Sequence, residues 1–161
     1  MTKKFKSLAA LAIVGACLAA PASSQATLVF TRNPLSPTVY VAKDNGSGVR
    51  KIGAGSNPRV SPDGQTIVFY RFGKGQQPSE LMAVPTTGGP PRRLASGWQD
   101  PFVFAWSADS STIAVLLGPE VGKQRLTTID LATGVQQTIA GGFFSGVSFA
   151  PHGGQLVFAR S

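Results

Sequence analysis

The stretch Val60-Ser61-Pro62-Asp63-Gly64 decides the fold, because it leads within two residues into the apolar run Ile67-Val68-Phe69. Pro62 presets the backbone for the second position of a type I turn, and Gly64 accepts the left-handed conformation that returns the chain as a strand. The Ser61 hydroxyl is suited to bonding the amide groups of such a turn. We therefore expect a β-turn here and assign Asp63 to the turn rather than to catalysis.

The turn pattern returns twice, as Trp106-Ser107-Ala108-Asp109-Ser110 and as Phe149-Ala150-Pro151-His152-Gly153. The steps from Val60 to Trp106 and from Trp106 to Phe149 are 46 and 43 residues long. Repeats of this length are typical of β-propellers, in which each repeat forms a blade of four strands. The residues that define the repeated turn are Ser61, Pro62, Asp63, Gly64, Ser107, Asp109, Pro151 and Gly153.

Strand-like segments recur at fixed places after each turn. The apolar runs 67–71, 112–117 and 156–160 follow the turns, and residues 28–32 match them. Because these runs are nearly continuous, we expect both of their faces to be covered. Third strands are expected at 39–42, 81–84 and 126–131, and fourth strands at 49–52, 91–94 and 135–139. The variable loops 33–38, 72–79 and 118–123 are where repeat proteins place binding surfaces.

This spacing predicts an all-β fold of β-propeller blades, and the 19 glycines and 12 prolines suit such a turn-rich protein. Three strands precede Asn57, two four-stranded antiparallel units extend to about Gly141, and two strands follow. This amounts to about three blades, whereas closed propellers have about 4–8, so we expect an incomplete ring or open arc. A truncated or split gene product is one explanation, and an arc that pairs with another chain is the other.

Residues 1–26 have the pattern of a signal peptide. Lys3, Lys4 and Lys6 precede an apolar run from Leu8 to about Ala20. This run is short of the roughly 20 residues that span a bilayer comfortably. Small residues before Thr27 favour cleavage there, leaving the propeller repeats at 27–161. The sequence thus predicts a periplasmic or secreted protein.

Lipidation is the alternative route. Val14-Gly15-Ala16-Cys17 resembles a bacterial lipobox, in which Cys17 becomes the lipid anchor. The motif departs from the pattern at Val14, and apolar residues rather than polar ones follow Cys17, so we favour the soluble form. A membrane partner is expected only if Cys17 is lipidated. Because Cys17 is the single cysteine, no internal disulfide forms and packing must provide the stability.

The positive charge favours anionic partners. The formal net charge of +8 includes three lysines of the leader, which leaves +5 after Ala26. An acidic protein face or an anionic envelope polymer fits this balance. We expect no nucleic-acid partner, because the basic residues form no dense cluster with interleaved aromatics and the signal directs the chain out of the cytoplasm.

The sequence contains no evident catalytic, metal or cofactor site. His152 is the only histidine and takes the place that Asp63 has in the first turn. Without a second histidine, a mature cysteine or a Gly-x-Ser-x-Gly elbow, neither a Ser-His-Asp triad nor a histidine metal site can be assembled. Asp63 and Asp109 stand alone, whereas calcium needs clustered oxygen ligands. Seven acidic residues leave a two-carboxylate hydrolase open as a weaker alternative.

Two groups of residues are candidates for partner binding. The basic pair Arg92 and Arg93 repeats the pair Arg50 and Lys51, but charges on an outer strand also block aggregation between sheet edges. Aromatic residues lie where the chain crosses between units and offer an apolar platform, although core packing is the more frequent role of such residues. These aromatic candidates are Trp98, Phe102, Phe143 and Phe144.

The repeated turn and the strand after it resemble the repeat of TolB-type β-propellers, a WD-like family. Residues 60–69 fit the family's aromatic or apolar residue, Ser-Pro-Asp-Gly and apolar strand, and Gly88-Gly89 with Arg93-Leu94 match its outer hairpin. The resemblance covers nearly all of 28–160 and implies the fold more than the function. TolB also has an N-terminal α/β domain that has no counterpart here, so a Tol-Pal role does not transfer.

The resemblance leaves two main functions open. The first is a non-enzymatic, exported binding module for a protein or an envelope polymer. The second is a truncated accessory or substrate-gating propeller of a peptidase or other hydrolase, with no catalytic residues of its own. Because TolB-like rings have six blades, two chains are expected to close a ring as a homodimer. Residues 28–32 and 156–160 duplicate the same strand of the blade, however, so simple sharing leaves one strand surplus.

Overall fold

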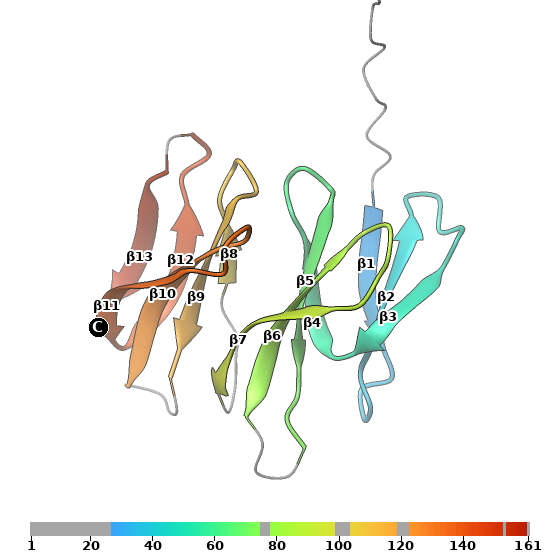
Figure 1. Cartoon of the computed structure of the whole chain (residues 1–161), viewed down its shortest axis with the longest axis horizontal. Helices are drawn as coiled ribbons and strands as arrows, with labels where there is room; N and C mark the ends of the chain where they lie inside the picture. Colours follow the sequence, from blue (N-terminus) through green and yellow to red (C-terminus); the bar gives the residue numbers. More distant parts are fainter. Residues whose placement is uncertain (1–26, 75–77, 99–103, 119–122, 153, 161) are drawn as a thin grey trace, which may run out of the picture.

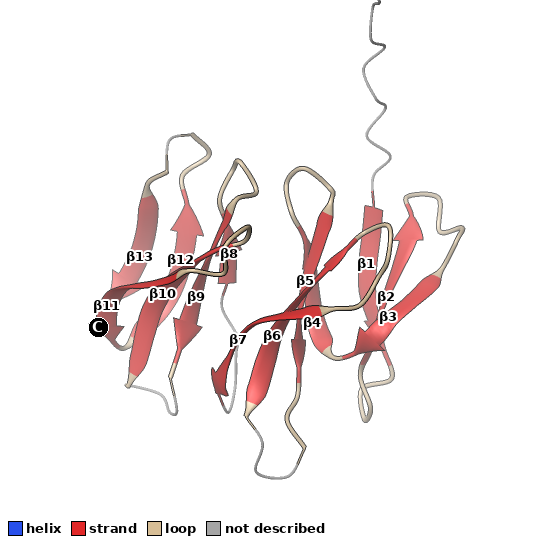
Figure 2. Ribbon diagram, viewed as in Figure 1, coloured by secondary structure: helices blue, strands red, loops and turns tan. Residues whose placement is uncertain are grey.

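The computed structural model describes residues 27–74, 78–98, 104–118, 123–152 and 154–160. In these ranges the chain forms strands joined by turns and loops, without a helix (Figure 2). The strands are β1 (Thr27–Arg32), β2 (Thr38–Lys43), β3 (Arg50–Ala54), β4 (Ser56–Val60), β5 (Thr66–Arg71), β6 (Ser79–Pro85), β7 (Arg92–Trp98), β8 (Phe104–Trp106), β9 (Thr112–Leu117), β10 (Gln124–Asp130), β11 (Gln136–Gly142), β12 (Phe144–Phe149) and β13 (Leu156–Arg160).

The strands form four antiparallel sheets that follow one another in chain order (Figure 1). Strands β1–β3 form the first sheet, β4–β7 the second, β8–β11 the third, and β12 and β13 the fourth. Each four-stranded sheet pairs its strands in sequence order, as a propeller blade does. The predicted all-β, unclosed arc of blades is therefore confirmed.

The fourth strands begin later than the sequence predicted. The strand expected at 91–94 begins at Arg92, because Pro91 has no amide hydrogen to give to the sheet. The strand expected at 135–139 begins at Gln136. Val135 belongs instead to the turn before it, where its carbonyl oxygen accepts a hydrogen bond from the Asp130 amide at 3.0 Å.

Three clusters of buried side chains lie between successive sheets. They join the first sheet to the second, the second to the third, and the third to the fourth. Side chains of β5 alternate between clusters, since Ile67 and Phe69 belong to the first and Val68 and Tyr70 to the second. Strand β9 is divided in the same way. The prediction that such strands are covered on both faces is confirmed for β5 and β9.

The same prediction is wrong for β1 and β13. Leu28 is 46% exposed and Val157 is 65% exposed. The cause is the position of these strands, because β1 and β13 are each the edge strand of an incomplete sheet. Their apolar sequences fit an interior strand, but the described chain does not surround them.

The first repeated turn forms as expected. The Gly64 amide donates to the Ser61 carbonyl at 2.8 Å, and Gly64 has a φ of 74°. The Ser61 hydroxyl donates to Asp63 Oδ1 at 2.5 Å and accepts the Thr66 amide at 2.9 Å. Hydrogen bonding to Ser61 is the main cause that lowers the pKa of Asp63. The Asp63 carboxylate therefore holds the turn together.

The second turn repeats these bonds and contacts the first. The Ser107 hydroxyl donates to Asp109 Oδ1 at 2.6 Å, and Ser110 adopts the left-handed conformation that Gly64 has in the first turn. The Ser110 hydroxyl also accepts the Asp63 amide at 3.0 Å, which links the two sheets. In the third turn, Pro151 and His152 are exposed, and Gly153 lies outside the described residues.

Arginines at the start of two outer strands connect adjacent sheets. Arg50 of β3 donates to the Thr86 carbonyl oxygen at 2.5 Å. Arg92 of β7 makes the equivalent bond to the Leu131 carbonyl oxygen, one sheet further along. Both carbonyls follow the third strand of the next blade. This repeated contact gives the basic outer-strand residues a role in blade packing that the sequence did not reveal.

We expect Gly55→Ala to destabilise the protein by at least about 2 kcal/mol, as strained backbone combined with overpacking does. Gly55 joins β3 to β4 with a φ of 151°, and a Cβ there would lie 2.2 Å from the Tyr70 carbonyl oxygen and 2.7 Å from Phe69. Gly53→Ala is the control, because its nearest contact would be 3.9 Å away. Chemical denaturation measures both, and equal stabilities would contradict the packing argument.

Candidate binding pocket at the loop end of the second sheet

The repeated turns and the variable loops lie at opposite ends of the sheets. The turns before β5, β9 and β13 are at the upper end in Figure 1, and β1, β5 and β9 run down toward the variable loops. A pocket of about 640 Å³ opens at the lower end, beside the connection between β5 and β6. Its lining comes from β3, β5, β6, β7 and the flanking loop: Ala54, Arg71, Phe72, Gly73, Lys74, Pro78, Glu80, Arg93 and Ser96.

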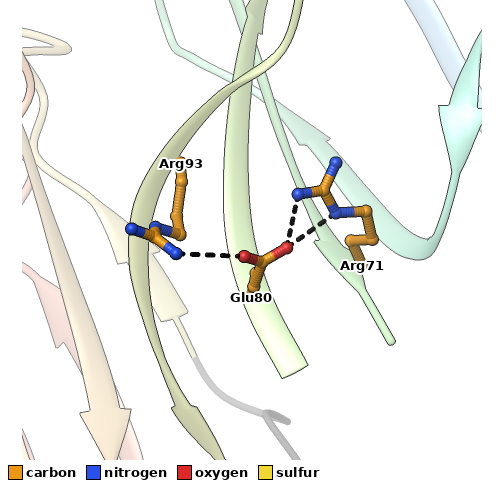
Figure 3. Close-up of polar contacts among 3 residues, drawn as sticks. All are labelled: Arg71, Glu80 and Arg93. Atoms are coloured by element: carbon orange, nitrogen blue, oxygen red, sulfur yellow. Dashed lines mark hydrogen bonds and ion pairs between the residues drawn. The ribbon is translucent and has the colours of Figure 1, made fainter. Parts of the chain in front are cut away.

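Glu80 is the polar centre of this pocket (Figure 3). Its Oε2 accepts the Arg71 Nε at 2.7 Å and lies 2.5 Å from the Arg71 Nη2. Its Oε1 accepts the Arg93 Nη1 at 3.4 Å. The β5–β6 register places Arg71 directly opposite Glu80, while Arg93 reaches the carboxylate from β7. One carboxylate thus orients two guanidinium groups.

The pocket has an excess of positive charge. Arg71, Lys74 and Arg93 contribute three cations to its lining, and Glu80 contributes the one carboxylate. The hydrogen bond from Arg71 is the main cause that lowers the pKa of Glu80, so the carboxylate is ionised at neutral pH. Each guanidinium carries five N–H donors, and Glu80 occupies only some of them. The remaining donors suit a carboxylate or phosphate ligand.

The two predicted basic residues have different roles. Arg92 donates to the Leu131 carbonyl oxygen beside the third sheet and so contributes to blade packing. The residue is exposed, and its assignment to a partner surface stays a prediction. Arg93 lines the pocket, and its side chain is 62% exposed. Of the two arginines, only Arg93 lines this pocket.

One residue of the predicted aromatic platform, Phe144, is buried. Phe144 is only 4% exposed and packs edge-on against Phe158, with 5.7 Å between ring centroids. Its assignment to a partner surface is corrected to core packing, because β12 turns this side chain toward the third cluster. Phe143 is exposed, and Trp98 is the last residue of β7. Phe102 and Cys17 lie outside the described residues.

Arg71, Lys74 and Glu80 were not identified from the sequence. The available signal was Glu80 opposite Arg71 across the loop, but it depends on the register of β5 and β6. Within the described ranges, there is no group of three or more His, Cys, Asp or Glu side chains placed to hold a metal ion. The described residues also contain no helix long and apolar enough to cross a membrane.

No family model and no curated protein matches this sequence. Solved structures do match it. TolB from Acinetobacter baumannii matches with a TM-score of 0.63 and 22% identity, over 84% of this chain and 35% of TolB. The fold is that of a β-propeller.

Two other solved propeller structures also resemble the arc. A TolB protein described as putative from Agrobacterium tumefaciens has a TM-score of 0.54 and 18% identity, covering 71% of this chain and 43% of its own. The β-propeller domain of the Trilobed protease from Pyrococcus furiosus has a TM-score of 0.57 and 18% identity, covering 71% and 39%. The arc therefore spans less than half the length of each of these three structures.

We expect Glu80→Gln to lower the thermal midpoint slightly at neutral pH but not in acid. The pKa of Glu80 is lowered from its ordinary 4.5. Its ion pairs therefore stabilise the fold above pH 4.5, and this stabilisation is lost as the pH falls through the folded-state pKa. Because Arg71 is 46% exposed, screening limits the effect to about 0.5 kcal/mol. Melts of both proteins across this pH range measure it, and a difference independent of pH would argue against ion pairing.

Proposed function

We propose that this arc is a non-enzymatic binding module that holds an acidic group of a protein or an envelope polymer. The observation that carries the proposal is the cationic pocket around Glu80, with two oriented guanidinium groups and Lys74. An acidic protein face and an envelope polymer both present carboxylates. The pocket chemistry therefore supports either source.

The geometry favours recognition over chemistry. The polar side chains that line the pocket are Arg71, Lys74, Glu80, Arg93 and Ser96. Glu80 accepts hydrogen bonds from both arginines, and its lowered pKa makes it a weak base. Ser96 has no histidine beside it in the lining to take its proton. Guanidinium groups bind carboxylates through paired N–H donors, which is a binding role.

Removing either arginine should weaken binding of poly-L-glutamate, the probe for an acidic protein face. Each of Arg71→Gln and Arg93→Gln removes hydrogen bonds to a charged group. Such bonds contribute about 1.5–3 kcal/mol and 1.4 kcal/mol is tenfold, so we expect binding to weaken by tenfold or more in each variant. Titration calorimetry measures the affinity, and pelleting with purified peptidoglycan tests the polymer source.

Arg125→Gln is the matched control. Arg125 is exposed on β10 in the third sheet, outside the lining of the pocket, and its replacement removes the same charge. It should leave the affinity nearly unchanged. Equal losses in all three variants would show attraction to the overall charge of the protein, and no binding to either probe would count against the proposed function.

We also propose that the protein is exported and cleaved before Thr27. The lysine-flanked apolar segment of residues 3–20 supports this assignment. Intact-mass measurement of the exported protein should give an N-terminus at Thr27, and Cys17→Ser should not change that mass. An N-terminus at a lipid-modified Cys17, lost in the Cys17→Ser variant, would establish the anchored form instead.

A further inference from the structure

The first and last strands of the described chain have nearly the same sequence. Leu28-Val29-Phe30-Thr31-Arg32 of β1 and Leu156-Val157-Phe158-Ala159-Arg160 of β13 are identical at four of five positions. Both occupy the second place in a blade. Strand β13 pairs with β12 as β5 pairs with β4, whereas β1 pairs with β2 as β5 pairs with β6.

The two incomplete sheets are complementary. The first sheet has the second, third and fourth strands of a blade, and the fourth sheet has the first and second. Val157 is 65% exposed and Phe158 is 37% exposed. The corresponding residues of β5, Val68 and Phe69, are buried between sheets. Strand β13 therefore has the side chains of an interior strand without the neighbours of one.

We propose that a second copy of this chain supplies the missing neighbours by strand exchange. Strand β13 of one copy takes the place of β1 beside β2 of the other copy. In the register that β1 uses, Val157 lies opposite Val41 and Phe158 opposite Tyr40 of the second copy. The composite blade then consists of β12 and β13 from one copy and β2 and β3 from the other.

The repeated sequence lets β13 reproduce the contacts of β1. Phe30 stacks on Tyr40 with 5.7 Å between ring centroids, and the Arg32 guanidinium lies 5.1 Å from both ring centroids. Phe158 and Arg160 bring the same side chains to the same positions, with one residue between them as before. The exchange therefore keeps the aromatic and cationic contacts of β2 and changes only which copy provides them.

The exchange also covers an open groove beside β13. A cavity of about 470 Å³ lies between the third sheet and the β12–β13 hairpin, with Ile139, Phe149 and Leu156 among its lining. Third and fourth strands beside β13 would lie over this groove, as β6 and β7 do in the second sheet. Burial of Ile139, Val157 and Phe158 gives the exchanged form apolar contacts that the single arc lacks.

Two such exchanges related by a two-fold axis close a ring. Each copy contributes two complete sheets, and two composite blades join the copies, which gives six blades. This number is within the range of closed propellers. One β1 strand is released at each junction. The interface repeats itself symmetrically, as expected for a two-fold dimer, and it does not involve the pocket around Glu80.

Sedimentation of the full chain tests the assembly. We expect a mass twice the 16.7 kDa of one chain. Val157→Asp should give a single-chain mass, because it places a charge where the exchange buries a side chain. Val135→Asp is the control, since Val135 is 64% exposed but lies in the β10–β11 turn. Far-ultraviolet circular dichroism checks that both variants fold. A single-chain mass for the unmodified protein, or a dimer of the Val157→Asp variant, overturns the proposal.

A disulfide tests the register in a Cys17→Ser background. Val41→Cys with Val157→Cys should form a cross-link between two copies, because residues directly opposite in paired strands have Cβ atoms about 4.5–5.5 Å apart. Val41→Cys with Val135→Cys should not. Non-reducing gel electrophoresis shows the linked species. A dimer without the 41–157 cross-link, or equal cross-linking of both pairs, rejects this strand exchange.

Discussion

The structure depends on burying both faces of the second strand of a blade between neighbouring sheets. Residues 67–70 of β5 alternate between two apolar clusters, and β9 does the same one sheet further along. A fully buried Val, Ile or Phe side chain contributes about 1.5–3 kcal/mol, so these strands provide much of the stability. No sheet can satisfy this constraint by itself, which is why the blades stack in a row and why each needs a neighbour on both sides.

Polar contacts at the upper end of the sheets fix how the blades stack. The Ser61–Asp63 and Ser107–Asp109 bonds shape two successive turns, and the Asp63 amide reaches Ser110 in the next turn. Arg50 and Arg92 then hold the carbonyl after the third strand of the following blade. The turns at the upper end make these contacts between sheets. The loops of variable sequence lie at the lower end, where the arc forms the cationic pocket around Glu80.

The two ends of the arc show what happens where the constraint is not met. Strands β1 and β13 have interior sequences, yet Leu28, Val157 and Phe158 are exposed. Because the described chain places no third and fourth strands beside β13, an apolar groove remains open there. The binding pocket lies within the complete part of the arc, so its geometry depends on the second sheet and on Ala54 of the first rather than on how the edges are covered.

The sequence determined the repeat, the turn chemistry and the number of strands, because these follow from local backbone preferences and from apolar periodicity. It also anticipated the positions of the variable loops. The tertiary structure alone decided which polar residues meet. Arg71 and Glu80 are nine positions apart and become neighbours only through the β5–β6 register, while Arg92 and Leu131 come together only when one sheet packs on the next. The sequence specifies the chemistry of each side chain, but which side chains come together depends on strand register and on the packing of one sheet against the next.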